Sequence, residues 1–327
     1  MSVSERPRDY RYSFGCAAVS SEVRLSGLSA GDAGVPAFVS LRRAPIDRLD
    51  RDWTEAPVSP RDRTPVWLAV ARFAATTGDW LRVRYEYRGH FADFAIRADG
   101  REILVEASDT AEDEQLAHLL EGAILGQAMR LAGAPLIHGS AVSADGRAVM
   151  LIGGSGAGKS SLSWALVQQG CHLVSDDLAA CAISDDSVMV HPVRTRLRLW
   201  PDSAAGLSVK GDVASLLFPT APEMGKLGLL DPAVLAPAMP LHAIYQLRRS
   251  RTAGAVPGFE AMSPTAAIAQ LGANLYGHVA PARAARKLEL ATLSALASRV
   301  PVRLLTLPHG LDALPEMAAL LRHSLFA

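Results

Sequence analysis

The sequence has few cysteines, no excess charge of either sign and no long apolar run, and each absence excludes a class of protein. Its 327 residues contain only three cysteines, Cys16, Cys171 and Cys181. Because this number is odd and the spacing is wide, neither a disulfide framework nor a four-ligand zinc site is expected. The cysteines are typical of reduced thiols in a cytosolic protein.

Basic and acidic residues are balanced, 33 against 33, so the formal charge is zero. A general electrostatic affinity for nucleic acid or anionic lipid is therefore not expected. No apolar run approaches the ~20 residues of a membrane-spanning helix, and the N-terminus is polar and charged. We expect a soluble, cytoplasmic protein with neither a nucleic-acid nor a membrane partner.

The chain is long enough for two domains, and 49% of its residues are hydrophobic, which provides for a sizeable core. Between residues 67 and 107, alternating apolar and polar residues are interrupted by turn signals, which predicts short antiparallel strands. From Thr110 to Gly133 apolar residues recur at helical spacing. We therefore predict a β-rich N-terminal domain over residues 1–109 and an α/β domain over residues 110–327.

The most specific motif is a glycine-rich loop of the form G-x-x-x-x-G-K-[ST] within LIGGSGAGKSSLSWALVQQGCHLVSDDL. An apolar strand precedes the loop and a helix follows it, which favours phosphate binding over a purely structural glycine turn. We expect Lys159 to neutralise the β- and γ-phosphates and the Ser160 hydroxyl to reach Mg²⁺. The residues expected to line the phosphate site are Gly153, Gly154, Ser155, Gly156, Ala157, Gly158, Lys159, Ser160 and Ser161.

Two aspartates, Asp176 and Asp177, close the next apolar run. A connection of this length leaves room for one helix, so the pair is expected at a strand end beside the phosphate loop. Adjacent residues on a strand point to opposite faces, so the two carboxylates are expected to have different roles. The alternative is a turn that carries two solvated charges.

The order of LIHGSAV, a strand, the serine-rich loop and SDD resembles the catalytic core of the HPr kinase/phosphorylase family, from His138 to Leu178. Phosphoenolpyruvate carboxykinases share this layout. The resemblance implies a mixed sheet with flanking helices. It also implies that Asp176 is the catalytic carboxylate facing the acceptor hydroxyl, that Asp177 supports the metal, and that His138 lies against the pair. Without these neighbours, His138 would equally suit a satisfied histidine on an apolar strand.

The sequence departs from that family after the aspartates. In place of an acidic, glycine-rich EIRG-type segment it has VRTRLRLWPDSAAGL, so a second metal carboxylate is unassigned. This segment resembles HPr-kinase-like proteins encoded with ribosomally made peptides, including those that phosphorylate lasso-peptide precursors. Arg194, Arg196 and Arg198 alternate, so on a strand they would project from one face toward phosphate or an acidic acceptor. A solvated strand face is the alternative.

Other basic residues have weaker signals. Lys226 lies between glycines and is a candidate for stabilising transition-state charge, whereas Arg248, Arg249 and Arg251 are expected in a solvated basic turn.

Together these features predict an ATP-dependent, Mg²⁺-requiring kinase that phosphorylates a serine-type or C-terminal hydroxyl on a peptide or small protein. The catalytic candidates are Asp176, Asp177, His138 and Lys159. A small-molecule kinase and a non-catalytic ATP-binding or peptide-recognition module are the alternatives. The N-terminal region is expected to recruit the acceptor, to build a homo-oligomer, or to serve as a structural flank.

Overall fold

The computed structural model describes residues 9–44, 67–75, 78–87, 90–107, 113–207, 217–219, 227–229, 234–250, 257–277, 283–308, 310 and 314–326. The chain divides into two compact units, the first made of Met1–Ala134 with Gly277–Ala285 and the second of Pro135–Tyr276 with Arg286–Ala327. The predicted boundary between residues 109 and 110 lies outside the described residues. Within those residues, no helix is long and apolar enough to cross a membrane.

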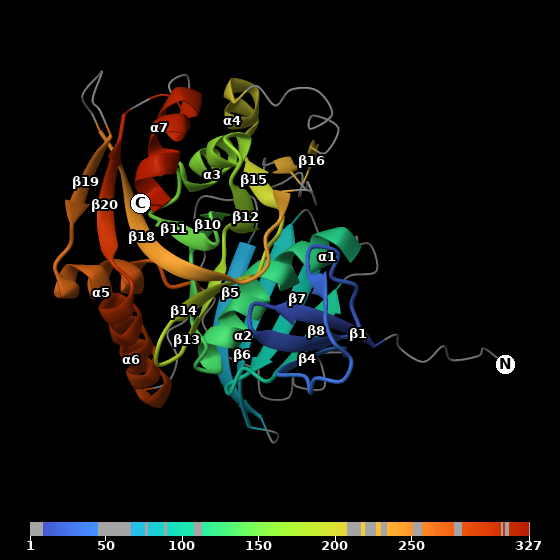
Figure 1. The fold of residues 1–327 in the computed structure, drawn as a ribbon. Helices are drawn as coiled ribbons and strands as arrows, with labels where there is room; N and C mark the ends of the chain where they lie inside the picture. Colours follow the sequence, from blue (N-terminus) through green and yellow to red (C-terminus); the bar gives the residue numbers. More distant parts are fainter. Residues whose placement is uncertain are drawn as a thin grey trace. The chain divides into compact units, whose positions relative to one another are not determined.

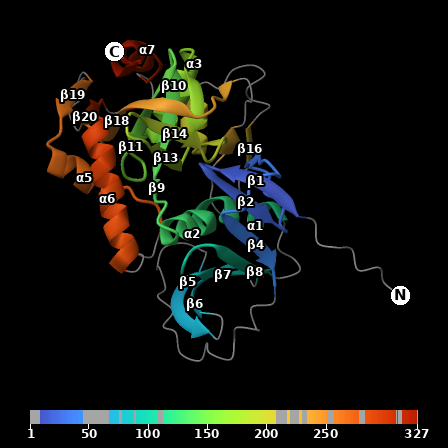
Figure 2. The same cartoon turned by 60° about the horizontal axis from the view of Figure 1, so that its bottom comes forward.

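The first unit is built on an eight-stranded sheet in the order β3-β1-β2-β4-β8-β7-β6-β5. The predicted antiparallel pairing over residues 67–107 is confirmed for β5 to β8 (Figure 2). β4, in contrast, runs parallel to both β2 and β8, which the sequence did not predict. The strands are β1 (Tyr10–Phe14), β2 (Ala17–Ser21), β3 (Ser29–Ala30), β4 (Val39–Arg43), β5 (Trp67–Ala75), β6 (Gly78–Tyr87), β7 (His90–Arg97) and β8 (Glu102–Ala107).

The helix predicted before Gly133 is present and belongs to the first unit. It consists of α1 (Asp113–Leu119), a π-helical turn (Leu120–Ile124) and α2 (Leu125–Leu131). The buried Glu121 carboxylate accepts a hydrogen bond from the backbone N–H of Gly27 at 2.6 Å. Because this long-range contact ties the helix to the N-terminal strands, the first unit extends well beyond residue 109.

The second unit contains a nine-stranded mixed sheet, which confirms the predicted α/β class. Its main order is β12-β10-β11-β18-β14-β13-β9, and β20 pairs with both β18 and β19. β11, β18 and β20 are parallel, and β10 and β11 form an antiparallel hairpin. The strands are β9 (Leu136–Ile137), β10 (Gly139–Ala144), β11 (Arg147–Ile152), β12 (His172–Ser175), β13 (Ala179–Ile183), β14 (Val188–Pro192), β18 (Met239–Arg249), β19 (Gly258–Ala261) and β20 (Val302–Leu307).

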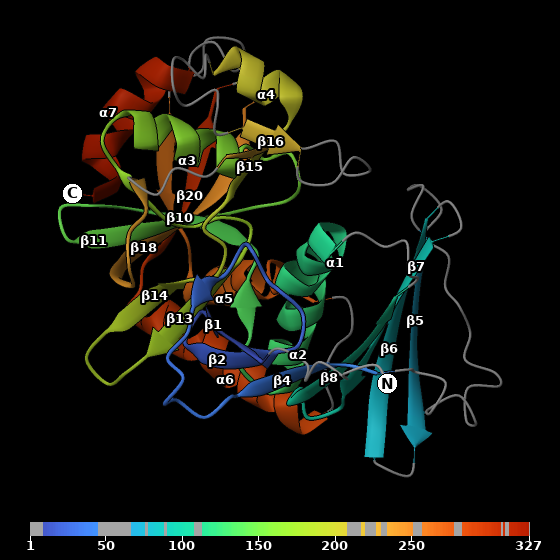
Figure 3. The ribbon, with the colours of Figure 1, turned by 90° about the vertical axis from the view of Figure 1, so that its right-hand side faces the viewer.

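Helices cover both faces of this sheet (Figures 1 and 3). Val149 and Leu151 of β11 enter a core with α3 and α7, while Met150 and Ile152 enter another with α5 and α6. This alternation is the two-residue period of a strand buried on both faces. The remaining elements are α3 (Lys159–Gln168), α4 (Pro201–Gly206), α5 (Pro264–Ala273), α6 (Arg283–Arg299), α7 (Leu314–Phe326), β15 (Leu197–Leu199), β16 (Leu217–Pro219) and β17 (Leu227–Leu229).

Candidate active site

The glycine-rich loop joins β11 to α3, as the sequence predicted. The N–H of Ala157 donates to the carbonyl of Gly154 at 3.2 Å, and Leu162 N–H donates to Gly158 O at 2.8 Å to begin the helix. Gly158, the N-cap, has a φ of +98°, which side-chain-bearing residues rarely adopt. The loop therefore presents its backbone at a helix N-terminus, the arrangement that suits phosphate.

The side chain of Lys159 folds back over this loop. Its Nζ donates to the carbonyl oxygens of Gly153 at 2.7 Å and Gly154 at 3.2 Å, and the residue is 8% exposed. Both of these acceptors are neutral carbonyl oxygens of the loop itself. The lysine is thus held beside the loop, where a bound phosphate would meet it.

Asn274, at the C-terminal end of α5, fixes the base of the loop. Its Oδ1 accepts from Gly153 N–H at 3.0 Å, and its Nδ2 donates to Gln270 O at 2.8 Å and Gln246 Oε1 at 3.3 Å. Its own carbonyl accepts from His138 N–H at 2.6 Å. Sequence reasoning missed this residue because no local pattern connects it with a loop more than a hundred residues earlier.

Arg249, at the end of β18, also lies against the loop and corrects the prediction of a solvated basic turn. A Cβ built on Gly158 would lie 2.9 Å from Arg249 Nη2, so the guanidinium group packs directly against the loop at this glycine. Arg249 Nε is buried and has no hydrogen-bond partner among the described residues. Arg248 is exposed, as predicted, and pairs with Glu260 at 2.8 Å, but it lies on β18 and not in a turn. Arg251 lies outside the described residues.

Asp176 lies directly beside the helix that follows the loop. Ser160 Oγ donates to its carboxylate, at 3.0 Å from Oδ1 and 3.2 Å from Oδ2, and Arg198 N–H donates to Oδ2 at 2.9 Å. The residue is 1% exposed. Burial raises the pKa of the Asp176 carboxyl, and the neighbouring charge of Asp177 raises that pKa further.

This pair of groups suits a magnesium ion. The Ser160 hydroxyl and the Asp176 carboxylate supply the oxygen ligands that Mg²⁺ prefers. A buried carboxylate with a raised pKa is also an environment that a divalent cation would relieve. In the described ranges, no group of three or more His, Cys, Asp or Glu side chains gathers around a common centre. The remaining ligands would therefore be phosphate oxygens and water, as is usual for Mg²⁺.

Asp177 has different surroundings because the backbone turns at this residue. Its φ is +68°, and β12 has already ended at Ser175, so the strand alternation that predicted opposite faces does not apply. Asp177 Oδ2 accepts from Arg194 Nη1 at 2.9 Å and from Arg198 Nη1 at 3.4 Å. The structure thus places Asp176, not Asp177, beside Ser160, which is the reverse of the expected arrangement.

The arginines reach Asp177 through a hydrogen-bonded turn, not from one continuous strand face. Ser175 Oγ accepts from Val193 N–H at 2.9 Å and Arg194 N–H at 3.0 Å, which pins this segment to the aspartates. β15 covers only Leu197–Leu199. Arg194 and Arg198 are buried, whereas Arg196 is half-buried. The other proposed cation, Lys226, lies outside the described residues.

His138 lies against the aspartates, where the resemblance placed it. Its Nδ1 is 2.9 Å from the Asp177 carbonyl oxygen and 3.4 Å from Asp177 Oδ1. Because a carbonyl can only accept, Nδ1 carries the proton and Nε2 has a lone pair. Burial lowers the pKa of His138, so the ring is neutral at pH 7. Tyr276 lies beside it, and burial raises the pKa of its phenol to about 12.

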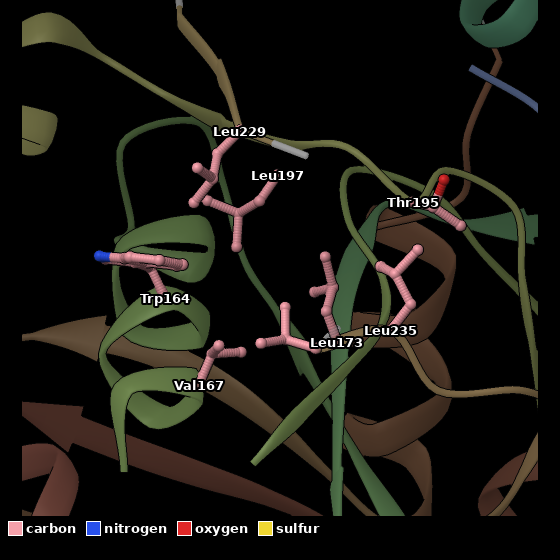
Figure 4. Close-up of a pocket in the computed structure, with 8 residues that line it drawn as sticks. Trp164, Val167, Leu173, Thr195, Leu197, Leu229 and Leu235 are labelled. Carbon is pink, nitrogen blue, oxygen red and sulfur yellow. The ribbon is translucent and has the colours of Figure 1, made fainter. Parts of the chain in front are cut away.

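A pocket beside α3, lined in part by Trp164 and Val167, has different chemistry (Figure 4). Its lining is apolar except for Thr195, and it contains no charged group that could hold a phosphate. The indole of Trp164 contributes to it from α3, and its Nε1 has no hydrogen-bond partner among the described residues. The lining residues are Trp164, Val167, Leu173, Thr195, Leu197, Leu229, Val234 and Leu235.

The segment that carries this geometry is similar to one known protein family. Residues 129–197 match the HPr Serine kinase C-terminal domain. This matched segment contains the loop, both aspartates, His138 and Arg194.

The chain was also compared with solved structures and with curated proteins. The HPr(Ser) kinase/phosphatase from Coxiella burnetii is 14% identical to the chain, with a TM-score of 0.32. The alignment covers 58% of this chain and 97% of that one. At that TM-score the likeness is too distant to transfer topology or activity. Among curated proteins, none matches the chain.

Proposed function

We propose that this chain is an ATP-dependent kinase that phosphorylates a hydroxyl group of a peptide or small protein. The observation that carries the proposal is the contact between the loop serine, Ser160, and the buried carboxylate of Asp176, at 3.0 Å. A glycine turn with only a structural role would not need a buried carboxylate at its first helical turn. Lys159, held over the same loop, supplies a cation for the phosphates.

The reaction forms a bond between the acceptor oxygen and the γ-phosphorus and breaks the bond from that phosphorus to the β,γ-bridging oxygen. The acceptor hydroxyl loses a proton, and ADP leaves. Catalysis of this reaction depends mainly on alignment and charge neutralisation. Mg²⁺, when bound at Ser160 and Asp176, would neutralise charge on the β- and γ-phosphates.

The geometry favours a division of roles opposite to the one implied by the family resemblance. Asp176 is engaged with Ser160 and is 1% exposed, which suits the metal side of the site. The Asp177 side chain is 17% exposed, and its Oδ1 faces His138 while Oδ2 is held by arginines. We assign Asp177 to the acceptor side, where it orients the hydroxyl and accepts its proton. His138 positions this carboxylate through its contacts with Asp177.

The proposed acceptor follows from one segment of the sequence and not from the geometry of the loop. A peptide acceptor, in particular a lasso-peptide precursor with a C-terminal hydroxyl residue, is supported only by the resemblance of Val193–Leu207 to kinases of that kind. The two alternatives, a small-molecule kinase and a module that binds ATP without transfer, share the same loop geometry. The first structural unit is proposed to recruit the acceptor or to mediate self-association.

The acceptor class can be decided by mass spectrometry. We expect the protein, given Mg²⁺ and ATP, to add one phosphoryl group to a peptide with an internal or C-terminal serine, and to release one ADP for each. Small alcohols and sugars serve as the comparison set, and Lys159→Ala as the inactive control. If only small molecules gain phosphate, the peptide proposal is wrong. Normal ATP affinity with no acceptor-dependent ADP release would instead identify a binding module.

Arg249 provides a test of the nucleotide site itself. We expect Arg249→Met to weaken both ATP and ADP binding about 10- to 100-fold, because a charge-assisted hydrogen bond contributes roughly 1.5–3 kcal/mol. The matched control is Arg248→Met, which removes the neighbouring arginine on the same strand, whose guanidinium instead pairs with Glu260. Isothermal titration calorimetry measures both variants. Equal affinities in the two variants would remove Arg249 from the site.

A further inference from the structure

Arg198 has hydrogen-bonding capacity that the folded chain does not use. The residue is 7% exposed, so its guanidinium is almost fully removed from water. Nη1 lies 3.4 Å from Asp177 Oδ2, but Nε and Nη2 are buried and no described residue accepts a hydrogen bond from either. Buried donors without acceptors are costly, and they persist mainly where a ligand supplies the acceptors.

The two nitrogens without a partner among the described residues, Nε and Nη2, lie on the same side of the Arg198 guanidinium. Nε and Nη2 form one edge of the planar guanidinium, with their N–H bonds nearly parallel. This edge matches two oxygens of a carboxylate or a phosphate, which it binds with two hydrogen bonds at once. Arg198 therefore contacts Asp177 through Nη1, and the edge formed by Nε and Nη2 has no hydrogen-bond acceptor among the described residues.

The local charge also favours an anion. Arg194 and Arg198 both bind the same oxygen of Asp177, so the two guanidinium groups share one carboxylate oxygen. Arg194 lies at the shorter distance from that oxygen, 2.9 Å against 3.4 Å for Arg198. The second carboxylate, Asp176, is engaged by Ser160 and by the backbone N–H of Arg198. The Arg198 guanidinium therefore shares its carboxylate partner with Arg194 and holds that partner at the longer distance.

We propose that the Nε–Nη2 edge of Arg198 is an oxyanion subsite, which binds either the phosphoryl group being transferred or a carboxylate of the acceptor. The inference rests on the proposed kinase function and specifies which group of the substrates the arginine recognises. Both sources share the chemistry of two oxygens in one plane, so probes of each kind are needed to distinguish them.

The first test is stability without ligand. In Arg198→Met, a long apolar side chain replaces a buried cation with two unsatisfied donors, while Arg194 still pairs with Asp177. The melting temperature of the ligand-free protein is therefore expected to stay equal or to rise. A fall of several degrees would show that Arg198 holds the fold together, and would overturn the proposal. Arg248→Met is the matched control for the loss of an arginine from the surface.

The second test is anion binding to protein saturated with Mg²⁺ and ADP, which occupies the glycine-rich loop. Inorganic phosphate and acetate are titrated separately into wild type, Arg198→Met and Arg198→Lys. We expect at least one anion to bind wild type and to lose at least tenfold in affinity in both variants, because lysine keeps the charge but not the two-pronged edge. Loss of phosphate binding identifies the transferred group, and loss of acetate binding identifies an acceptor carboxylate.

Failure of this inference is distinguishable from failure of the proposed function. If wild type binds Mg²⁺ and ADP but its affinities for phosphate and acetate are the same in all three proteins, the subsite is excluded and the kinase proposal stands. If wild type binds neither ADP nor ATP, the kinase proposal fails first, and the subsite, which rests on it, falls with it.

Discussion

Asp176→Asn is expected to weaken Mg²⁺-dependent ATP binding and to reduce phosphoryl transfer by orders of magnitude. The substitution keeps the shape of the side chain. The amide oxygen can still accept a hydrogen bond from Arg198 N–H, and the amide nitrogen can donate one to Ser160 Oγ. It removes the negative charge beside the Ser160 hydroxyl, which is the charge that would hold the metal. Affinity measured without Mg²⁺ should change little.

Asp177→Asn is expected to reduce phosphoryl transfer without weakening Mg²⁺-dependent ATP binding. Mg²⁺-dependent ATP affinity should be close to that of wild type, while single-turnover transfer falls about 10²- to 10⁴-fold, the usual contribution of a general base. The chain supplies a matched control, since Ser184, Asp185 and Asp186 repeat the same tripeptide on an exposed turn. Asp186→Asn, at the position in that tripeptide that corresponds to Asp177, should leave both quantities unchanged. The opposite pattern, with Asp177 controlling metal dependence and Asp176 controlling transfer alone, would restore the assignment implied by the family.

Because the pKa of Asp176 is raised, the melting temperature of Asp176→Asn is also expected to depend on pH. A carboxyl with a folded-state pKa above its unfolded value of about 3.9 stabilises the fold when protonated, and this contribution is lost as pH rises through the folded-state pKa. At pH 7 the ligand-free Asp176→Asn protein should therefore melt at a higher temperature than wild type, with the difference disappearing below about pH 4. A lower melting temperature at pH 7 would mean that the charged carboxylate stabilises the empty site.

Lys159→Ala is expected to abolish measurable ATP binding, or to weaken it by at least about 100-fold, which corresponds to 2.7 kcal/mol or more. Its ammonium group is buried and bonded to two loop carbonyls, so it is in place before phosphate arrives. Losing these two hydrogen bonds should cost about 1–3 kcal/mol of folding free energy. The protein should remain folded, as circular dichroism would show.

Lys287→Ala is the control for this change because Lys287 is exposed on α6. It should retain wild-type ATP affinity and transfer rate. If Lys159→Ala is folded and binds ATP as tightly as Lys287→Ala does, the glycine-rich loop is not the nucleotide site.

The sequence by itself determined the local elements of the site. The strand–loop–helix at residues 147–168 follows from an apolar run, four glycines and a helical repeat, all within one stretch of chain. The hairpin of β10 and β11 and the strands β18 and β20 were predictable for the same reason, because their side-chain periodicity is a short-range property. The proximity of His138 to the aspartates came from a resemblance, not from any pattern in the residues themselves.

Only the tertiary structure decided which residues share the site. A single left-handed residue, Asp177, breaks the strand alternation and so exchanges the positions that the two carboxylates were expected to occupy. Asn274 and Arg249 reach the loop from α5 and β18 through pairings between distant parts of the chain, which no local pattern encodes. The unused edge of Arg198 depends on burial and on the lack of acceptors in the described surroundings, and both are properties of the packed chain.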